Sequence, residues 1–330
     1  MKKYVLPLLT FVLLTAGATL LAYPHAAAWL SSYNQAKVVD AYNEELKHAQ
    51  PPVNAQIQEA HKYNDALSAG VQVVPGQGVP TSAGSVHATN GEVLNYKDLL
   101  DADGNGLMAR IKIPSINVDL PIYHGTSAAT LLKGAGHLEG SSLPVGGVGT
   151  RTVITAHRGL ASATMFTNLN RVKKGDVFTI ETFGEVYAYR VFDIQVIDPN
   201  TQTRTLLAEP GRDLATLITC TPLGVNSHRI VVTGERVPTD LTNPKNATGI
   251  KSDQPGFPWW LVAWIAAIAA IAAFCWWLTR GGRKASAKGA GAAAAGATGD
   301  GAAAASGAEG AAASADTVEK APEGPENATD

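Results

Sequence analysis

The chain has 330 residues, of which 16% are charged, and its formal net charge is −2. This balance offers no basic surface to a polyanion, so the composition argues against nucleic acid as a partner. The two cysteines, Cys220 and Cys275, do not form a disulfide framework, because Cys275 lies inside an apolar segment long enough to span a membrane.

Two apolar segments bracket the chain. Residues 5–22 follow Lys2 and Lys3, and residues 259–278 have paired tryptophans at both ends and a basic flank behind them. Each is close to the roughly 20 residues that cross a bilayer, and basic flanks favour the cytoplasmic side. We predict a multi-pass cell-membrane protein with its middle region outside the cell. A signal peptide is the alternative for the first segment, because Ala26–Ala28 resembles a cleavage site.

The segment over 26–70 is predicted to be helical. Apolar residues recur at helical spacing over 38–46 and over 57–67, and Pro51–Pro52 separates the two patterns. The prolines break any long heptad repeat, so we expect these helices to pack against the extracellular domain or to form a stalk instead of a coiled coil.

Residues 71–106 are rich in Gly, Pro and Ser and show neither helical nor strand periodicity. We interpret them as an irregular loop, either a lid over a site or a linker. Asp101, Asp103 and Asn105 resemble the start of a calcium-binding loop, but Lys112 stands where the bidentate glutamate is required. This pattern therefore predicts a turn into the first strand.

The region over 107–238 is predicted to be a mostly β domain, because short apolar runs and turn residues alternate at the spacing of a barrel or sandwich. Its length is within the usual range for one domain. Short helices are expected near 128–133 and 165–169. The predicted strands cover 108–113, 118–123, 152–156, 177–181, 186–197, 215–220 and 229–232.

The rest of the chain divides into a linker over 239–258, a transmembrane helix over 259–279 and a cytoplasmic tail over 280–330. The tail begins with the basic flank and continues as an Ala/Gly-rich sequence with few large apolar residues. Such a sequence buries too little surface to offset its ordering entropy, so we predict that it is disordered.

Three strand ends carry residues of complementary chemistry: Cys220 ends one strand, His157 follows another, and Arg229 opens a third. A cysteine attacks as thiolate, and a nearby base or cation promotes that form. A histidine can return the proton to a departing amine, and an arginine can bind a developing oxyanion. Together they favour acyl transfer through a thioester.

The residues alone leave alternatives open. Free cysteines are commonly small buried apolar residues, which would leave Cys220 without a catalytic role. His124, His137 and His228 are also available as bases. The extracellular region has one cysteine and no closely spaced Cys or His pair, so no metal site is predicted.

The strand that ends at Cys220 resembles the TLxTC signature of sortases, the cysteine transpeptidases of Gram-positive cell surfaces. Further blocks are similar to the class C branch, which polymerises pilins, and they lie in order through 107–236. These blocks are TLITC (216–220), TPLGVNSHR (221–229), LPIYHGT (120–126), GHLEGSSLPVGG (136–147) and HRGL (157–160).

The resemblance implies an eight-stranded β-barrel flanked by the two transmembrane helices. It also implies that Cys220 is the nucleophile, His157 the general acid and base, and Arg229 the oxyanion or substrate-positioning residue, with Thr219 and Thr221 as substrate contacts. The expected partners are proteins that carry an LPxTG-like signal, cleaved between Thr and Gly, and a pilin lysine that accepts the acyl group. Thioester chemistry implies no cofactor.

One departure from class C concerns the lid. Its usual Asp-Pro-aromatic motif is missing between Gly70 and Asp101, which leaves both a divergent lid and a linker open. Two other functions also stay open. One is a sortase that anchors surface proteins to peptidoglycan through a cell-wall precursor amine, and the other is a non-catalytic membrane scaffold that binds pilins.

Overall fold

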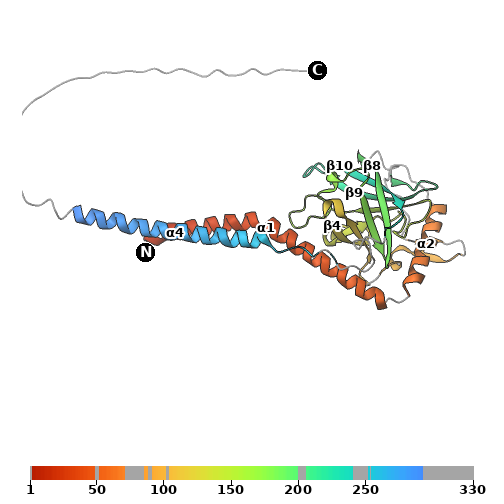
Figure 1. Ribbon diagram of the computed structural model, residues 1–330, viewed down its shortest axis with the longest axis horizontal. Coiled ribbons are helices and arrows are strands. Elements are labelled where there is room, and N and C mark those ends of the chain that lie inside the picture. Colours follow the sequence, from red (N-terminus) through yellow and green to blue (C-terminus); the bar gives the residue numbers. More distant parts are fainter. Residues whose placement is uncertain are drawn as a thin grey trace, which may run out of the picture. The chain divides into compact units, whose positions relative to one another are not determined.

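The computed structural model describes residues 2–48, 52–70, 85–87, 91–101, 104–199, 206–240, 252 and 254–292. Residues Met1–Trp276 form one compact unit and Trp277–Asp330 form a second. The first unit contains a closed eight-stranded β-barrel that two long helices precede in the chain (Figure 1).

After the first two helices, most of the regular secondary structure up to Val237 is β-strand. The helices are α1 (Lys2–Glu45), α2 (Val53–Gly70), α3 (Ala128–Lys133) and α4 (Trp259–Ala292), with short 3-10 turns η1 (Leu46–His48), η2 (Tyr96–Asp98), η3 (Pro114–Ile116) and η4 (Leu169–Arg171). The strands are β1 (Ser85–His87), β2 (Val93–Asn95), β3 (Leu107–Ile113), β4 (Val118–His124), β5 (Ala135–His137), β6 (Thr150–Thr155), β7 (Val177–Thr182), β8 (Glu185–Ile197), β9 (Asp213–Thr221) and β10 (His228–Val237).

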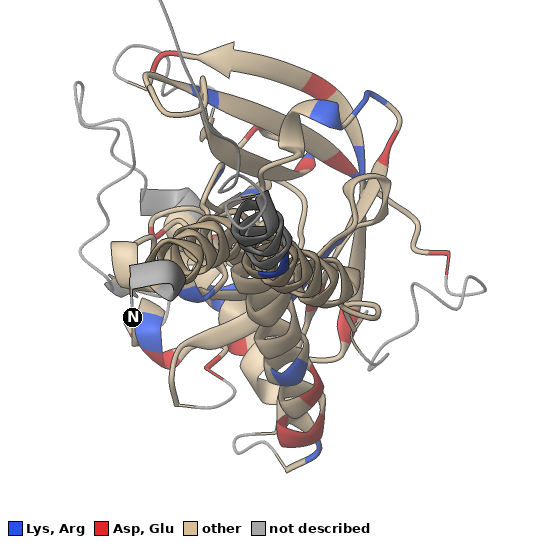
Figure 2. Ribbon diagram, turned by 90° about the vertical axis from the view of Figure 1, so that its left-hand side faces the viewer, with Lys and Arg blue, Asp and Glu red and all other residues tan. Residues whose placement is uncertain are grey.

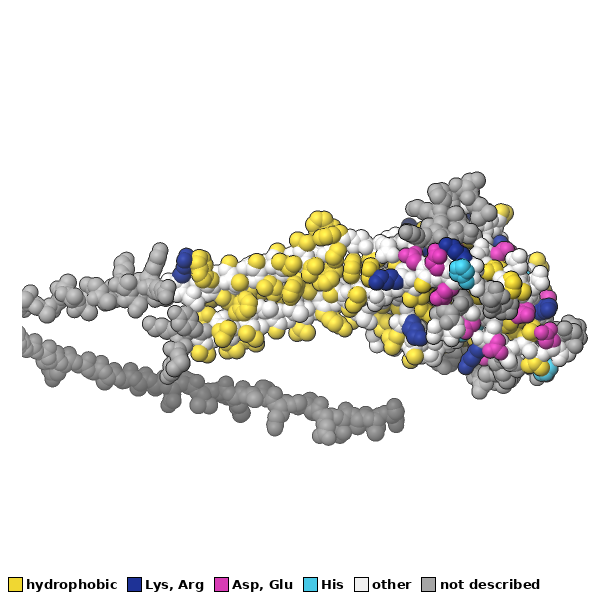
Figure 3. Space-filling model, turned by 90° about the horizontal axis from the view of Figure 1, so that it is seen from below, with side chains coloured by type: hydrophobic (Ala, Val, Ile, Leu, Met, Phe, Trp, Pro, Cys, Tyr) yellow, Lys and Arg dark blue, Asp and Glu magenta, His cyan; other side chains and the backbone are white. Residues whose placement is uncertain are grey.

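Two helical segments, Val5–His48 and Trp259–Arg280, are long and apolar enough to cross a membrane by length and composition. In Figure 3, many hydrophobic side chains are exposed along the helical part of the chain. Helix α1 runs without a break from the first apolar segment into the segment predicted over 26–70, so the predicted anchor and the start of the predicted stalk are one helix. Helix α4 extends to Ala292, beyond the end predicted at residue 279.

The end of α1 and one face of α2, which includes Ala60, Tyr63 and Leu67, pack against the barrel. The hydroxyl of Tyr42 accepts a hydrogen bond from Phe183 N at 2.7 Å and donates to Met108 O at 3.2 Å. The side-chain amide of Asn64 binds both backbone groups of Leu143, at 2.7 and 3.1 Å. These buried polar contacts fix the helices to the strands, because each group would be costly to leave without a partner.

The barrel has the strand order β10-β8-β7-β3-β4-β5-β6-β9 and closes between β9 and β10. Most neighbouring strands are antiparallel, but β4 with β5 and β6 with β9 are parallel. Parallel neighbours end at the same edge of a sheet. The residues that follow β6 and those that end β9 are therefore brought to one rim of the barrel.

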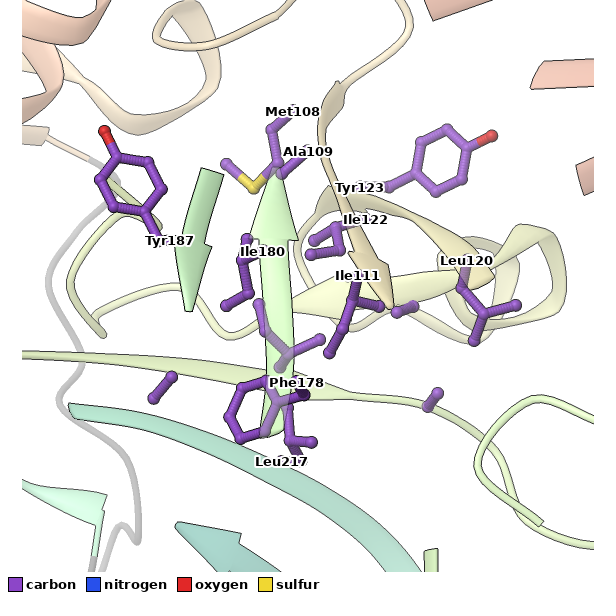
Figure 4. Packing of buried hydrophobic residues seen from close by; sticks show 14 of the residues in the cluster. Met108, Ala109, Ile111, Leu120, Ile122, Tyr123, Phe178, Ile180, Tyr187 and Leu217 are labelled. Atoms are coloured by element: carbon purple, nitrogen blue, oxygen red, sulfur yellow. The ribbon is translucent and has the colours of Figure 1, made fainter. Parts of the chain in front are cut away.

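The barrel interior is a continuous apolar core. Side chains alternate between the two faces of each strand, so every second residue of β3, β7 and β9 points inward. In Figure 4, Ile111, Phe178, Ile180 and Leu217 gather between these strands, and each is fully buried. A core of this size supports the barrel without a disulfide, in agreement with the two free cysteines.

Charged residues of both signs are scattered over the strands and loops (Figure 2). A few charged side chains are buried among the described residues, and Arg110 is the least exposed of them. Arg110, with 1% of its side chain exposed, donates to both carboxylate oxygens of Asp119 at 2.7 Å and reaches Glu181 at 3.5 Å. A buried guanidinium requires such partners, because an unpaired charge is strongly destabilising in the interior.

All seven predicted strands are present, and the helix expected near 128–133 is α3. The helix expected near 165–169 is wrong: this stretch consists of turns that lead into η4. Part of the stretch predicted to be irregular, 71–106, is regular, because β1 pairs with β2 and η2 follows. Residues 71–84 of the predicted lid or linker, and 293–330 of the predicted tail, lie outside the described residues.

Candidate active site

Cys220 lies near the end of β9 on the outer face of the barrel wall. Leu217 on the same strand points into the core, whereas Ile218 belongs to a second, smaller cluster outside it. Because side chains alternate along a strand, Cys220 shares the outer face with Ile218. Its side chain is partly exposed, as a nucleophile requires.

Arg229 lies directly opposite Cys220 in the β9–β10 ladder. Paired residues on antiparallel strands project from the same face, with Cβ atoms about 5 Å apart. The ladder therefore places the first side-chain atoms of Cys220 and Arg229 next to each other. In this structure Arg229 Nη1 donates to the carbonyl oxygens of Asn226, at 2.8 Å, and His228, at 3.0 Å.

His157 reaches the same rim from β6, on the other side of β9. The parallel register pairs Thr155 with Ile218. Ala156 N then donates to Ile218 O at 3.2 Å, and Ala156 O accepts from Thr219 Oγ1 at 2.8 Å. Continued by one residue, this register places His157 beside Cys220. The fold therefore brings the three residues together, with the cysteine in the middle.

The two threonines beside the cysteine have different surroundings. Thr219 is 1% exposed and its hydroxyl binds Ala156 O, so it holds the segment before His157 from inside the wall and does not face the outer surface. Thr221 is partly exposed, and its Oγ1 accepts a hydrogen bond from Arg158 Nη1 at 2.9 Å. Arg158 was not among the predicted site residues, although it stands next to His157 in the quoted HRGL block.

An outer apolar cluster continues from Cys220 along the same face. It consists of Val153, Ile197, Ile218 and Val231, with Leu138 and Leu206 packed against it. Leu206 comes from the connection between β8 and β9, so this connection covers part of the outer face. The four residues of the cluster are buried, with Ile218, the most exposed of them, at 8%.

An ion network closes the far end of this face. Arg151 of β6 contacts Glu209 at 2.6 Å, and Arg212 contacts Glu209 at 2.7 Å and Glu235 at 2.8 Å. The hydrogen bond and charge of Arg212 lower the pKa of Glu235. These contacts join the end of the β8–β9 connection to β6 and β10, so they limit how far that connection can move from the wall.

The other histidines considered as bases have structural positions. His137 is 0% exposed, its Nε2 lies 2.8 Å from Ser142 O, and burial lowers its pKa to about 4. The ring nitrogens of His124 lie 3.0 Å from Gly106 O and 2.8 Å from Leu99 O. His228 pairs with Thr221 and so projects to the face opposite Cys220. Of the histidines considered, His157 is the one that the β6–β9 register places beside Cys220.

Within the part of the chain that the structure describes, no group of three or more His, Cys, Asp or Glu side chains is placed to hold a metal ion. The calcium-like run also has another use: Asp101 Oδ1 accepts a hydrogen bond from Gly106 N at 2.8 Å. This contact closes a turn before β3, as the sequence predicts.

Comparison with known proteins agrees with this geometry. The sortase domain matches residues 111–237, which include all three rim residues. Sortase C1 of Streptococcus agalactiae is 36% identical over 62% of this chain and 100% of its own, with a TM-score of 0.53. The chain belongs to the sortase family.

Two further solved sortases are similar. Sortase A of Corynebacterium diphtheriae is 38% identical over 66% of this chain and 94% of its own, with a TM-score of 0.52. Sortase C of Streptococcus pneumoniae is 37% identical over 61% of this chain and 97% of its own, with a TM-score of 0.51.

Among curated sortases, sortase A of Bacillus anthracis is 29% identical over 42% of this chain, and sortase D of Bacillus subtilis is 30% identical over 38%. The chain spans 63% and 62% of the lengths of these two relatives, less than two thirds of each. Sortases are cysteine transpeptidases, and the three residues at the rim are of the types that such a reaction requires.

Proposed function

We propose that this sortase joins pilin subunits outside the cell through a thioester on Cys220. The observation that carries the proposal is the direct pairing of Cys220 with Arg229, with the His157 segment hydrogen-bonded to the opposite edge of β9. A class C assignment draws on the similarity to sortase C1 of Streptococcus agalactiae and to sortase C of Streptococcus pneumoniae, whose structure has been described in terms of pilin substrate specificity.

In the first half-reaction, an LPxTG-like signal binds with its Thr–Gly bond at the thiol of Cys220, which is partly exposed. The Cys220 thiolate attacks the threonine carbonyl carbon, and the Arg229 guanidinium turns from the Asn226 carbonyl to bind the oxyanion. His157 gives its proton to the glycine nitrogen as the C–N bond breaks. The products are a thioester on Cys220 and a free amine.

In the second half-reaction, a lysine amine of another pilin attacks the thioester carbon. His157, now neutral, accepts the proton that the amine loses, and the C–S bond breaks to regenerate the thiolate. The new bond is an isopeptide. No redox or metal step is needed, because each half-reaction exchanges one acyl bond for another.

The proposed location is the cell membrane, with the barrel outside. The two apolar helical segments are suited to span the bilayer, and Lys2, Lys3 and Arg280 favour a cytoplasmic position for both of their outer ends. The catalytic rim would then lie on the extracellular side of the cell membrane, as would membrane-tethered substrates.

The test is a denaturing gel of surface extracts, probed for a co-encoded LPxTG pilin, from cells that carry wild-type protein, Cys220→Ala or His157→Ala. A ladder that resists heat and detergent in wild type and collapses to monomer in both variants supports pilin polymerisation.

Other results identify the remaining functions. Pilin monomers held in the wall by wild type and released in the variants point to a cell-wall precursor amine as acceptor, which makes the protein a peptidoglycan-anchoring sortase. Identical patterns in all three strains contradict a catalytic role and leave a scaffold that binds pilins without joining them.

A further inference from the structure

Arg158 follows His157 in the chain and reaches across to the other catalytic strand. Its Nη1 donates to Oγ1 of Thr221, the residue after Cys220, at 2.9 Å. Its Nε donates to the carbonyl oxygen of Thr167 at 3.2 Å. One side chain therefore joins the His157 segment, the end of β9 and the turn that follows in the β6–β7 connection.

Apart from the Arg158 contact, the hydrogen bonds between the His157 segment and β9 come mainly from residues that precede the histidine. Upstream of the histidine, Ala156 binds β9 through both its N–H and its carbonyl. Downstream, β6 has ended, and the main-chain contacts turn away from β9: Phe166 N donates to His157 O at 2.9 Å, and Gly159 N donates to Thr167 Oγ1 at 3.1 Å. The Arg158–Thr221 bond links this downstream segment back to the cysteine strand, β9.

The two residues of this bond are each adjacent to a member of the proposed catalytic pair. Arg158 is next to His157, and Thr221 is next to Cys220, so a shift of one relative to the other changes the distance between imidazole and thiol. A misplacement of about 1 Å can cost a factor of about 100 in rate. The planar guanidinium suits this task, because its donors have a fixed geometry and can hold two acceptors at once.

We propose that Arg158 is a positioning residue that sets the spacing between the His157 imidazole and the Cys220 thiol through its bond to Thr221. The inference rests on the proposed transpeptidase function. It adds to that function a side chain that acts through His157 and Cys220 and does not itself touch the reacting atoms.

The experiment measures steady-state turnover of a fluorogenic LPxTG peptide with an amine acceptor, using the full-length protein in detergent. The variants are Arg158→Met, Thr221→Val, the two combined, and Arg158→Lys. Arg171→Met is the matched control, since Arg171 is exposed and lies on the same β6–β7 connection.

We expect Arg158→Met and Thr221→Val each to lower kcat about 10- to 100-fold with KM within about twofold of wild type. The fold-loss in kcat of the double variant should not exceed that of the more impaired single variant, because both changes remove the same bond. Arg158→Lys should recover part of the loss, because an ammonium can still donate to one acceptor. Arg171→Met should match wild type.

Three results overturn the inference: wild-type kcat in Arg158→Met, fold-losses that multiply in the double variant, or losses that appear in KM alone. The last would make Thr221 a substrate contact. If Arg158→Met does not fold, Thr221→Val gives the same test, because valine keeps the shape of threonine without its hydroxyl. A wild-type enzyme that does not turn over refutes the proposed function and this inference together, whereas wild-type turnover with unaffected variants refutes this inference alone.

Discussion

The stability of the barrel should fall as the pH drops from about 6.5 to 4, because His137 must remain neutral in the fold. This side chain is 0% exposed, and burial, together with the charge of His124, lowers its pKa to about 4. In the unfolded chain the pKa is near 6.5. Below that value the unfolded state binds a proton that the folded state does not, so acid favours unfolding.

The magnitude follows from the interval between these two pKa values. From 6.5 to about 4, at 1.36 kcal/mol per pH unit, the loss is about 3 kcal/mol, complete near pH 4 and absent above pH 7. The hydrogen bonds agree with a neutral ring. Nε2 faces the acceptor Ser142 O at 2.8 Å, which assigns the proton to that nitrogen, and Nδ1 accepts from the Tyr96 hydroxyl at 2.9 Å.

The assay is guanidinium unfolding of the full-length protein in detergent at several pH values from 4 to 7.5, for wild type and His137→Gln. Glutamine retains a donor for Ser142 O but does not titrate, so the variant should be less stable at pH 7 and should lose less stability toward pH 4. Other titrating groups, such as Asp213, whose pKa burial raises, are present in both proteins and cancel in the comparison. Equal pH slopes for the two proteins would refute the reasoning.

The remaining predictions concern two matched pairs of variants. Gly159 has φ +77° and an added Cβ would lie 2.5 Å from Leu223 Cδ2, whereas Gly175 has φ +96° and open space. Alanine at either site should lower the free energy of unfolding, measured with guanidinium, by about 1–2 kcal/mol. Only Gly159→Ala should also slow peptide turnover. Equal turnover in the two variants would contradict a role for the contact between the loops that carry Gly159 and Leu223. Asp119→Asn should cost about 3 kcal/mol, because it weakens the pairing of a buried arginine, while Asp193→Asn, which affects an exposed pair with Lys174, should cost under about 1 kcal/mol. Similar losses in both would show that burial does not control the strength of these pairs.

The strands and the three rim residues could be predicted because their signals are local. Runs such as 215–220 are short, apolar and rich in β-branched residues, which identifies them as strands, and Cys220, His157 and Arg229 each stand at the end of such a run. The pairing of Cys220 with Arg229 also follows from a short connection between adjacent strands, which makes an antiparallel ladder the expected arrangement.

Other features depend on contacts that no local pattern records. Strand β5, Ala135–His137, is three residues long, too short for periodicity to be recognised, and it exists because β4 and β6 flank it. The bond between Arg158 and Thr221 joins residues 63 positions apart in sequence, so it required the closed barrel to be seen. The residue types alone left His137 available as a base beside His157, and its burial and the β6–β9 register now separate the two.

The central claim, that Cys220 forms a thioester with the sorting signal, is tested most directly by intact-mass measurement of the full-length protein after incubation with an LPxTG peptide and no acceptor amine. The account predicts an adduct with the mass of the peptide up to its threonine, located on Cys220, absent in Cys220→Ala and removed by hydroxylamine. An unmodified wild-type protein while the peptide is cleaved, or an adduct that persists in Cys220→Ala, would contradict it.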